Sequence, residues 1–220
     1  MKAIICTQYG PPNVLQLQNI EKPTPKKNEV LVKIHATSVS TGDCRIRGFN
    51  SPLLFWIPMR IILGFRKPRN PILGVELSGE IEEIGTAAVQ LAKYFGATVT
   101  AVCSNSNFEL VQSLGADKVI DYTKEDFTKL GERYNIIFDA VGKHKKSLCE
   151  KALTPNGKYV SVNGMMAKVS KEDMILLKKL TEAEHLKPVI DRTYRLEEIA
   201  EAHIYVEKGH KKGNVSITLK

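Results

Sequence analysis

One stretch of this 220-residue chain, residues 86–122, limits its fold more than any other, because helical and strand patterns alternate along it. Apolar residues first recur at helical spacing, and residues 97–103 then form a nearly continuous β-rich run, which is typical of a strand covered on both faces. The capping-box spacing of Ser106-Asn107-Phe108-Glu109 predicts a second helix, and residues 118–122 form the next strand. This order predicts parallel strands joined by crossover helices.

The same rhythm continues in residues 134–142 and 158–164, so we expect an α/β chain with a doubly wound, nucleotide-binding sheet. Ligands of such sheets bind at the carboxyl ends of the strands. The residues expected at those ends are mostly small or polar: Cys103, Ser104, Asn105, Asp121, Tyr122, Ala140, Val141, Gly142, Asn163 and Gly164. The alternative is that they form ordinary strand-to-helix turns and bind nothing.

Composition narrows the class of protein. Apolar residues make up 43% of the chain, which is enough for a real core. No apolar run reaches the roughly 18–20 residues that cross a bilayer, and the N-terminus has no signal-peptide pattern. We therefore expect a cytoplasmic protein with no membrane partner. The four cysteines lie far apart, without zinc-ligand spacing, and are expected to be reduced thiols.

The net charge of +8 permits an anionic partner, but the lysines are spread along the chain. A phosphate-bearing cofactor explains the excess as well as nucleic acid does, and an ordinary solvated surface explains it more simply. We expect no nucleic-acid partner.

The N-terminal part reads as β-type segments at residues 2–7, 14–17 and 29–39. Residues 41–48, TGDCRIRG, form a polar break, whose charged residues either bind a substrate or pair with each other. Residues 51–65 are an apolar covering segment, which serves either as core filling or as the wall of a substrate pocket.

Strand-like alternation returns in residues 75–85. Beyond the predicted sheet, Ser170 begins a capped helix, and residues 186–190 form a brief strand. A helix with His203 packed inward follows at residues 196–207, and residues 213–219 close the chain as a strand.

Four stretches carry a resemblance to a known family: TGDCRIRG, PILGVELSGEIEEIG, LGADKVIDY and EAHIYVEKGHKKGNV. With them the chain resembles the medium-chain dehydrogenase/reductase superfamily, and within it the quinone-oxidoreductase-like relatives of the alcohol dehydrogenases that lack zinc. The resemblance implies a discontinuous GroES-like catalytic β-domain of residues 1–85 and 186–220. It also implies a Rossmann-type nucleotide-binding domain of residues 86–185, and both domains are incomplete.

The activity implied by this resemblance is hydride transfer from NADPH to a quinone, an enone or a small carbonyl substrate. Relatives of this kind allow a homodimer. The zinc branch of the superfamily needs a Cys and a His where this chain has Ser40 and Val75, so we expect no catalytic metal. Thr41 and Asp43 are candidates to orient substrate or water, or else they only cap a turn.

Cofactor choice follows from the end of the second Rossmann strand, where an acidic residue would favour NAD. Ser104 and Asn105 instead offer a hydroxyl and an amide beside a helix N-terminus, so NADPH is preferred. The resemblance implies that Tyr122 flanks the adenosine half and that Val141 and Gly142 lie on the nicotinamide side. It also implies that two asparagines approach the nicotinamide ribose: Asn163 and Asn214.

The chain departs from the family where a glycine-rich pyrophosphate loop should precede the first Rossmann helix. Gly85 and Thr86 are the candidates that remain for this contact, and Glu82 and Glu83 stand just before them. The first Rossmann strand and its neighbours are missing at Gly85–Thr86, and a second shortening is expected near residues 164–169.

Three accounts of the Gly85–Thr86 join are open: an incomplete sequence, a natural or engineered deletion form, or a non-catalytic nucleotide-binding or interaction remnant. A Cα separation well beyond about 3.8 Å would mean that the two residues are not bonded neighbours. We favour the first account. If the join is real, NADPH binding is expected to be weak or absent. Substrate identity and the proton donor cannot be read from the sequence.

Overall fold

The structure, a computed structural model, describes residues 1–24, 34, 36–51, 55–74, 81–142, 144–162, 169–209 and 211–219, of which 81–84 by backbone alone. The chain forms two compact units, Met1–Glu80 with Ile190–Lys220 (unit 1) and Ile81–Val189 (unit 2). The boundaries predicted from the sequence lie at Gly85 and Leu186. Each unit is described by itself.

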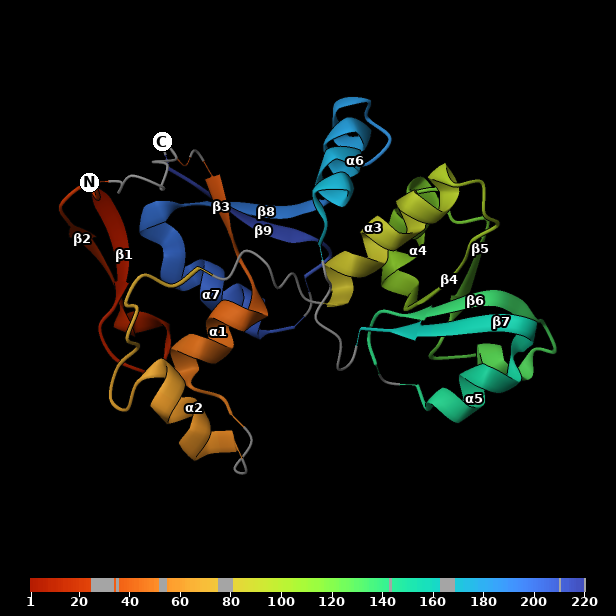
Figure 1. The fold of residues 1–220 in the computed structure, drawn as a ribbon, viewed down its shortest axis with the longest axis horizontal. Helices are drawn as coiled ribbons and strands as arrows, with labels where there is room; N and C mark the ends of the chain where they lie inside the picture. Colours follow the sequence, from red (N-terminus) through yellow and green to blue (C-terminus); the bar gives the residue numbers. More distant parts are fainter. Residues whose placement is uncertain are drawn as a thin grey trace. The chain divides into compact units, whose positions relative to one another are not determined.

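Unit 1 contains an antiparallel hairpin and a mixed three-stranded sheet (Figure 1). The first is the hairpin of β1 (Lys2–Cys6) and β2 (Leu15–Asn19), joined through a 3-10 turn at Pro12–Val14. The second is a three-stranded sheet in the order β3 (Ala36–Val39), β9 (Asn214–Thr218) and β8 (Ile190–Arg195). The central strand β9 is antiparallel to β3 and parallel to β8, so the end of the chain lies beside its N-terminal part.

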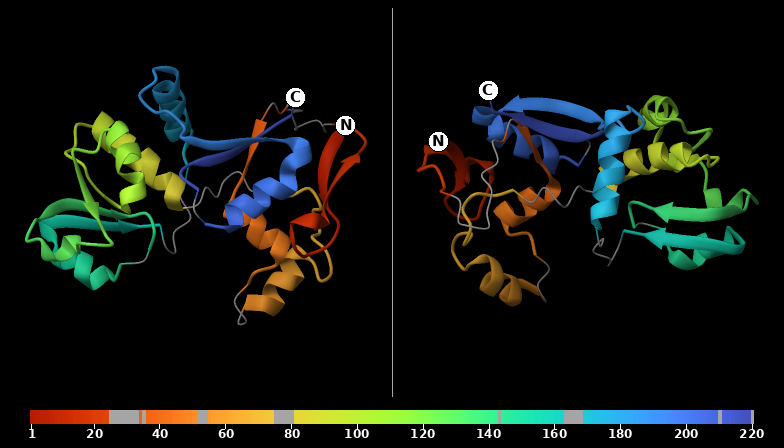
Figure 2. Two further views of the ribbon diagram at one scale, coloured as in Figure 1. Left: turned by 180° about the vertical axis from the view of Figure 1, so that it is seen from behind. Right: turned by 45° about the horizontal axis from the view of Figure 1, so that its top comes forward.

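Three helices accompany these strands: α1 (Thr41–Gly48), α2 (Trp56–Leu63) and α7 (Ile199–Glu207), the last preceded by a 3-10 turn at Leu196–Glu198. Helix α7 packs against the three-stranded sheet (Figure 2). The buried cluster between them consists of Val39, Cys44, Ala202, Val206, Val215 and Ile217. The core of unit 1 therefore joins both ends of the chain.

Unit 2 alternates helices and strands. Its elements are α3 (Ile81–Tyr94), β4 (Thr100–Cys103), α4 (Phe108–Ser113), β5 (Lys118–Asp121), β6 (Tyr134–Asp139), α5 (Lys146–Lys151), β7 (Leu153–Ser161) and α6 (Lys171–Glu182). Short 3-10 turns stand at Asn105–Asn107 and Phe127–Lys129. β4 pairs with β5 and β6 pairs with β7, both in parallel, which confirms the predicted parallel strands.

The four strands of unit 2 form two separate pairs rather than one sheet. In a complete doubly wound sheet the first strand lies between the second and the fourth. β4 to β7 match the second to fifth strands of that order, so the separation falls where the first strand would lie. The two pairs share an apolar cluster that includes Ile120 of β5 and Ile137 of β6.

Some predicted elements are wrong. Residues 41–48 form helix α1, not a polar break, because Ser40 and Asp43 build a capping box whose hydrogen bonds start a helix despite the polar composition. The strand predicted for residues 75–85 is contradicted at Ile81–Gly85, where the backbone belongs to α3. Residues 75–80 lie outside the described part of the chain.

Two further differences concern element ends. The N-cap of α4 is Asn107, without a side-chain hydrogen bond, so the predicted capping box at Ser106 is absent. The brief strand at residues 186–190 is wrong, because pairing with β9 begins only at Ile190. The capping box of α6 at Ser170 and Asp173 is confirmed, and so are α7 and β9.

Among the described residues, no helix is both long enough and apolar enough to cross a membrane.

Candidate functional site

The ends of β4 and β5 bring three of the predicted cofactor residues to one edge of unit 2. Cys103 and Asp121 are direct partners in the parallel register, so Ser104, Asn105 and Tyr122 follow at the same edge. Ser104 Oγ lies 3.0 Å from Ser106 Oγ, and the Tyr122 side chain is 58% exposed. This edge offers hydroxyl and amide groups next to an exposed aromatic ring.

Asp121 holds the chain as it leaves β5. Its Oδ1 accepts hydrogen bonds from the backbone N–H and the hydroxyl of Thr123, at 3.0 and 2.7 Å. These bonds lower the pKa of the Asp121 carboxyl, so the group is ionised at neutral pH. Its role is to fix the turn that presents Tyr122.

A second turn follows β6, where Asp139 is buried. Its Oδ1 accepts from the backbone N–H groups of Val141 and Gly142, at 3.1 and 2.7 Å, and its Oδ2 accepts from the Tyr159 hydroxyl at 2.9 Å. Gly142 has φ 68°, a conformation that glycine adopts without strain. Asp139 therefore positions the two residues predicted for the nicotinamide side.

Asp139 is not among the site residues predicted from the sequence. An aspartate that ends a strand and is followed by glycine is a known signature of a turn in which the carboxylate accepts backbone N–H groups. That signal is present in FDAVG and could have identified the residue.

The residues predicted to contact the pyrophosphate do not have the backbone conformation of a dinucleotide-binding loop. Gly85 and Thr86 lie inside α3 rather than at a turn, and Gln90 Nε2 donates to the Thr86 carbonyl at 3.3 Å. N–H groups in a helix interior are bonded within the helix and are not presented to a ligand. The sequence also puts Glu82 and Glu83 in the first turn of α3, where negative charge opposes a phosphate.

Gly85 and Thr86 are consecutive residues of one helix, and the three accounts of the join between them stay open. The residues of unit 2 therefore fit the two ends of a dinucleotide but not its pyrophosphate. A cofactor role for Gly85 and Thr86 stays a prediction without support from this geometry.

The predicted catalytic residues lie at the start of α1. Asp43 is buried and accepts from both the backbone N–H and the hydroxyl of Ser40 at 2.9 Å, while its own N–H donates to Ser40 Oγ at 3.3 Å. Thr41, the first residue of α1, is half-buried. Asp43 thus caps a helix, as the alternative interpretation expected, and a catalytic role for either residue stays a prediction.

Of the two positions that hold zinc ligands in the zinc branch of the superfamily, the structure describes one. The Ser40 hydroxyl is used in the capping box, and Val75 lies outside the described residues. In the part of the chain that the structure describes, no group of three or more His, Cys, Asp or Glu could hold a metal ion.

The two asparagines predicted near the nicotinamide ribose have different outcomes. Asn214 is the half-buried first residue of β9, opposite Ile190 of β8, and belongs to unit 1. Asn163 lies outside the described residues.

A cluster of polar side chains lies inside unit 1, around Arg47, which is 1% exposed. Its guanidinium donates to the Gly10 carbonyl, to Glu207 Oε1 and, through Nε, to His203 Nδ1 at 3.4 Å. Arg47 therefore pairs with a carboxylate that lies far away in the sequence, outside the TGDCRIRG stretch. The sequence predicted that the charges of TGDCRIRG either bind a substrate or pair with each other, and the Arg47–Glu207 pair matches neither interpretation.

Burial keeps the titratable side chains His203 and Cys44 of this cluster uncharged at neutral pH. Burial and the Arg47 charge lower the pKa of His203 to about 4, and burial with the nearby Glu207 charge raises the pKa of Cys44 to about 12. Cys44 Sγ lies 3.3 Å from His203 Nδ1. At neutral pH both groups are uncharged, so the pair is not an activated thiolate.

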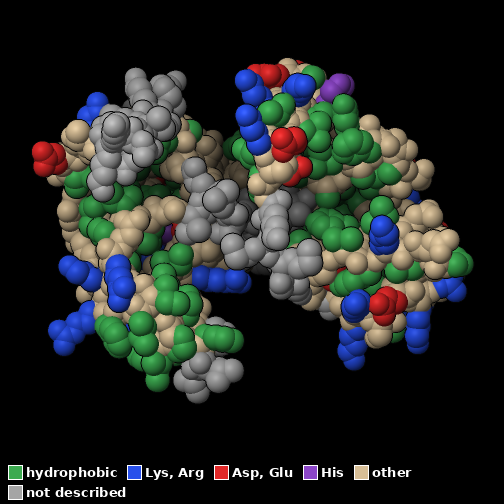
Figure 3. Space-filling model, viewed as in Figure 1, with side chains coloured by type: hydrophobic (Ala, Val, Ile, Leu, Met, Phe, Trp, Pro, Cys, Tyr) green, Lys and Arg blue, Asp and Glu red, His purple; other side chains and the backbone are tan. Residues whose placement is uncertain are grey.

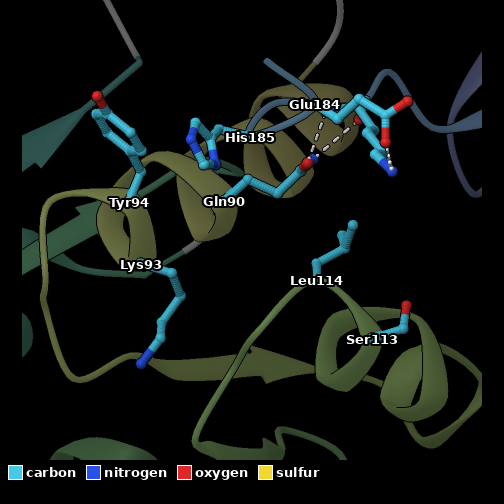
Figure 4. Close-up of a pocket in the computed structure, with 8 residues that line it drawn as sticks. Gln90, Lys93, Tyr94, Ser113, Leu114, Glu184 and His185 are labelled. Carbon is cyan, nitrogen blue, oxygen red and sulfur yellow. Dashed lines mark hydrogen bonds and ion pairs between the residues drawn. The ribbon is translucent and has the colours of Figure 1, made fainter. Parts of the chain in front are cut away.

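A cavity of about 470 Å³ lies in unit 2 between the ends of α3 and α4 and the segment after α6 (Figure 4). Gln90 connects α3 to the segment after α6. Its side chain accepts a hydrogen bond from the Lys187 N–H at 2.8 Å and donates one to the Lys187 carbonyl at 3.0 Å. The helices end where the following strands begin. The cavity is therefore at the amino ends of β4 and β5, opposite the edge with Ser104 and Tyr122, and is not the dinucleotide crevice.

Comparison with known proteins identifies matching families over most of the chain. A zinc-binding dehydrogenase family matches residues 84–187, and a second family with that description matches residues 162–216. The alcohol dehydrogenase GroES-like domain family matches residues 26–126. The first match begins at Ile84, next to the Gly85–Thr86 join.

Individual relatives match only in part. The "NADPH-dependent alkenal/one oxidoreductase, chloroplastic" of Arabidopsis thaliana is 36% identical over 146 residues, covering 61% of this chain and 37% of that protein. The "Quinone-oxidoreductase QR1, chloroplastic" of Triphysaria versicolor is 31% identical over 176 residues, covering 68% and 53%. The chain spans about a third to a half of the length of these relatives.

Among solved structures, the quinone oxidoreductase from Coxiella burnetii superposes with a TM-score of 0.72 over 100% of this chain and 99% of that one. The sequence identity is 19%, so the likeness is one of fold. It supports an α/β architecture with a GroES-like and a Rossmann-like domain.

Proposed function

This chain belongs to the medium-chain dehydrogenase/reductase superfamily, in its quinone-oxidoreductase-like branch, and on that premise we propose that it is an NADPH-dependent oxidoreductase. The proposed reaction is hydride transfer to a quinone, an enone or a small carbonyl compound, without zinc. The carrying observation is the shared edge of β4 and β5, where Ser104, Asn105 and Tyr122 follow paired strand ends.

The preference for NADPH rests on the chemistry of that edge. Neither Ser104 nor Asn105 carries a negative charge that would repel a 2′-phosphate, and both can donate hydrogen bonds to it. The name of the Arabidopsis relative, 36% identical, agrees with this preference.

The missing contact with the pyrophosphate is expected to lower the affinity for NADPH. Because α3 runs through Gly85 and Thr86, the 220-residue chain alone is expected to bind NADPH weakly. Nicotinamide, when bound, supplies the hydride, and the protein's own part is to hold the Val141–Gly142 turn through Asp139 and to present Tyr122 through Asp121.

A charge placed at the proposed 2′-phosphate position tests the cofactor preference. We expect Ser104→Asp to weaken NADPH binding about tenfold or more, leaving NADH binding nearly unchanged, because the new carboxylate repels only the 2′-phosphate. Ser113→Asp is the matched control, since it adds the same charge at the end of α4, at the opposite edge. Equal affinity of the unaltered chain for NADH and NADPH, by fluorescence titration, would refute the preference.

Turnover is tested by following NADPH oxidation with a panel of small quinones and enones, beside an intact-mass measurement of the chain. Oxidation that depends on the substrate supports the proposal. NADPH binding without oxidation of any panel member supports the second candidate, a non-catalytic nucleotide-binding or interaction remnant. The path of α3 through the pyrophosphate position is the observation that favours this candidate.

Zinc-free chemistry is supported by the use of the Ser40 hydroxyl as a helix cap. Activity that resists a strong zinc chelator is the expected result. A homodimer and a cytoplasmic location stay expectations from the sequence.

A further inference from the structure

Helix α2 has its charged and apolar sides exchanged relative to an ordinary surface helix. Its inward side carries Arg60, its one charged residue, while Ile57, Ile61 and Ile62 point outward and are 63%, 53% and 65% exposed. Surface helices normally bury the apolar stripe and expose the charges. No residue of α2 is buried.

The inward side of α2 is firmly held. The Arg60 guanidinium lies over three aromatic rings, 3.8 Å from the centroid of Phe49, 4.7 Å from Tyr9 and 4.8 Å from Trp56. The Tyr9 hydroxyl also donates to the Gly64 carbonyl at 3.0 Å. Trp56 belongs to α2, whereas Tyr9 and Phe49 do not, so the contacts with these two rings hold the Arg60 side of the helix against the rest of unit 1 and leave the isoleucines outward.

Positive charge surrounds this apolar surface. The loop that follows α2 exposes Arg66, Lys67 and Arg69, and the sequence has no acidic residue between Asp43 and Glu76. Phe65, at the start of that loop, is also exposed. Figure 3 shows hydrophobic side chains with Lys and Arg around them at the lower left, where α2 lies.

Another exposed apolar helix lacks this charge pattern. α6 exposes Met174, Ile175 and Leu176, but its charges are mixed, with Glu172 and Asp173 in its first turn and Lys178 paired to Glu182 at 3.7 Å. Exposed apolar area alone does not identify a partner. At α2 the partner must accept apolar side chains and carry negative charge around them.

We propose that α2 and the loop after it bind the surface of an anionic phospholipid membrane, with Ile57, Ile61, Ile62 and Phe65 in the interface and Arg66, Lys67 and Arg69 at the headgroups. An apolar helix face bordered by cations is the pattern of segments that lie in a membrane interface without spanning it. The absence of a spanning segment, from which the sequence analysis expected no membrane partner, does not bear on this mode.

Trp56, the one tryptophan of the chain, reports directly on this contact. The experiment uses the 220-residue chain with vesicles of phosphatidylcholine containing about one third phosphatidylserine, and with vesicles of phosphatidylcholine alone. We expect sedimentation with the anionic vesicles, a blue shift of Trp56 emission, and weaker binding at higher salt.

Paired variants separate the two contributions. Ile61→Ser with Ile62→Ser is expected to weaken vesicle binding about a hundredfold, because two apolar side chains no longer leave water. Arg66→Glu with Lys67→Glu is expected to abolish the preference for phosphatidylserine. Ile175→Ser with Leu176→Ser on α6 is the matched control and should bind like the unaltered chain. All six side chains are exposed or half-exposed, so unfolding midpoints should stay close together and show that each variant folds.

Three results would overturn the proposal. One is the absence of binding to either vesicle, and another is equal binding to both. The third is a dimer seen by sedimentation velocity without lipid and lost in Ile61→Ser with Ile62→Ser, because a second copy of the chain would then cover α2.

Discussion

Strand β9 of unit 1 and strand β6 of unit 2 show what a neighbouring strand does for a sheet. β9 lies between β3 and β8, and its Val215 and Ile217 are completely buried. β6 pairs only with β7 among the described strands, and its Ile136 is 66% exposed. β6 (YNIIFD) is the more apolar of the two strands and β9 (NVSIT) the less, so the difference in exposure comes from their surroundings.

This difference indicates that the loss of a central strand destabilises a domain more than the loss of a loop does. A missing loop leaves the remaining hydrogen bonds in place, whereas a missing central strand leaves two edges without partners and uncovers the side chains beside them. Unit 1 keeps its central strand because the C-terminal segment returns to supply it. The separation of β4–β5 from β6–β7 therefore marks where unit 2 should be weakest.

Hydrogen exchange should show the largest contrast between the units. We expect amides of β9 to exchange at least about a hundredfold more slowly than the amides of β4 and β6 on the edges away from their partners, because those edges open without global unfolding. Mass spectrometry of peptides covering the three strands would measure this. Equal protection in all three would break the comparison.

Removal of the Glu207 carboxylate should be the most destabilising substitution. Glu207→Ala leaves the Arg47 guanidinium buried without its ion-pair partner, so we expect a loss of about 3 kcal/mol or more in the free energy of unfolding of unit 1. Urea denaturation measures it. Combining Glu207→Ala with Arg47→Met should restore part of the loss. A double variant no more stable than the single one would contradict the role of the buried charge.

Acid should weaken unit 1 through His203. Its pKa is about 4 in the folded chain and near 6.5 when unfolded, so the unfolded state binds more protons between these values. The stabilisation is complete above about pH 6.5 and is lost as the pH falls towards 4, by up to roughly 3 kcal/mol. Urea midpoints between pH 7 and 4 would show the decline, and His203→Gln should flatten it. A wild-type midpoint that does not change over this range would exclude a buried neutral His203.

Asp139 should have a smaller effect, within unit 2. Asp139→Ala removes an acceptor of three hydrogen bonds, and we expect a loss of about 2 kcal/mol together with release of the Val141–Gly142 turn. Asp139→Asn keeps one carbonyl oxygen and should lose less. Thermal unfolding and weaker nucleotide binding would report the two consequences, and an unchanged turn in Asp139→Ala would contradict the assignment.

The smallest effect comes from a matched pair of tyrosines. Tyr205 in unit 1 donates to Asp191 at 2.7 Å, and Tyr159 in unit 2 donates to Asp139 at 2.9 Å. Each Tyr→Phe change should cost about 1 kcal/mol, because the same phenol–carboxylate bond is lost. Chemical denaturation of both variants would measure the two losses in the free energy of unfolding. A larger loss for Tyr159→Phe than for Tyr205→Phe would show that unit 2 is the more sensitive unit.

Much of the local structure could be predicted from sequence. The helical spacing before Gly96 and the β-rich run after it predicted α3 and β4, and Ser170 with Asp173 predicted the start of α6. These features depend on residues close together in the chain, for which periodicity and capping are sufficient guides. α1 was missed because its residues are polar, and its capping box at Ser40 and Asp43 was interpreted as a turn.

The candidate site also has one part that could be predicted from the sequence and one part that could not. The shared edge of Ser104 and Tyr122 followed from parallel pairing, whereas the conformation of Gly85 and Thr86 did not follow from the glycine itself. Glycine permits a turn but does not impose one, and the flanking residues continued the helix.

By itself, the sequence determined the parallel strands of unit 2, the absence of a glycine-rich loop and the family to which the chain belongs. Only the tertiary structure decided that Arg47 meets Glu207, 160 residues further along the chain, and that Arg60 turns inward while Ile61 faces outward. Periodicity shows which side chains share a face of a helix. Which face is buried depends on the aromatic rings and carboxylates that distant segments bring to it.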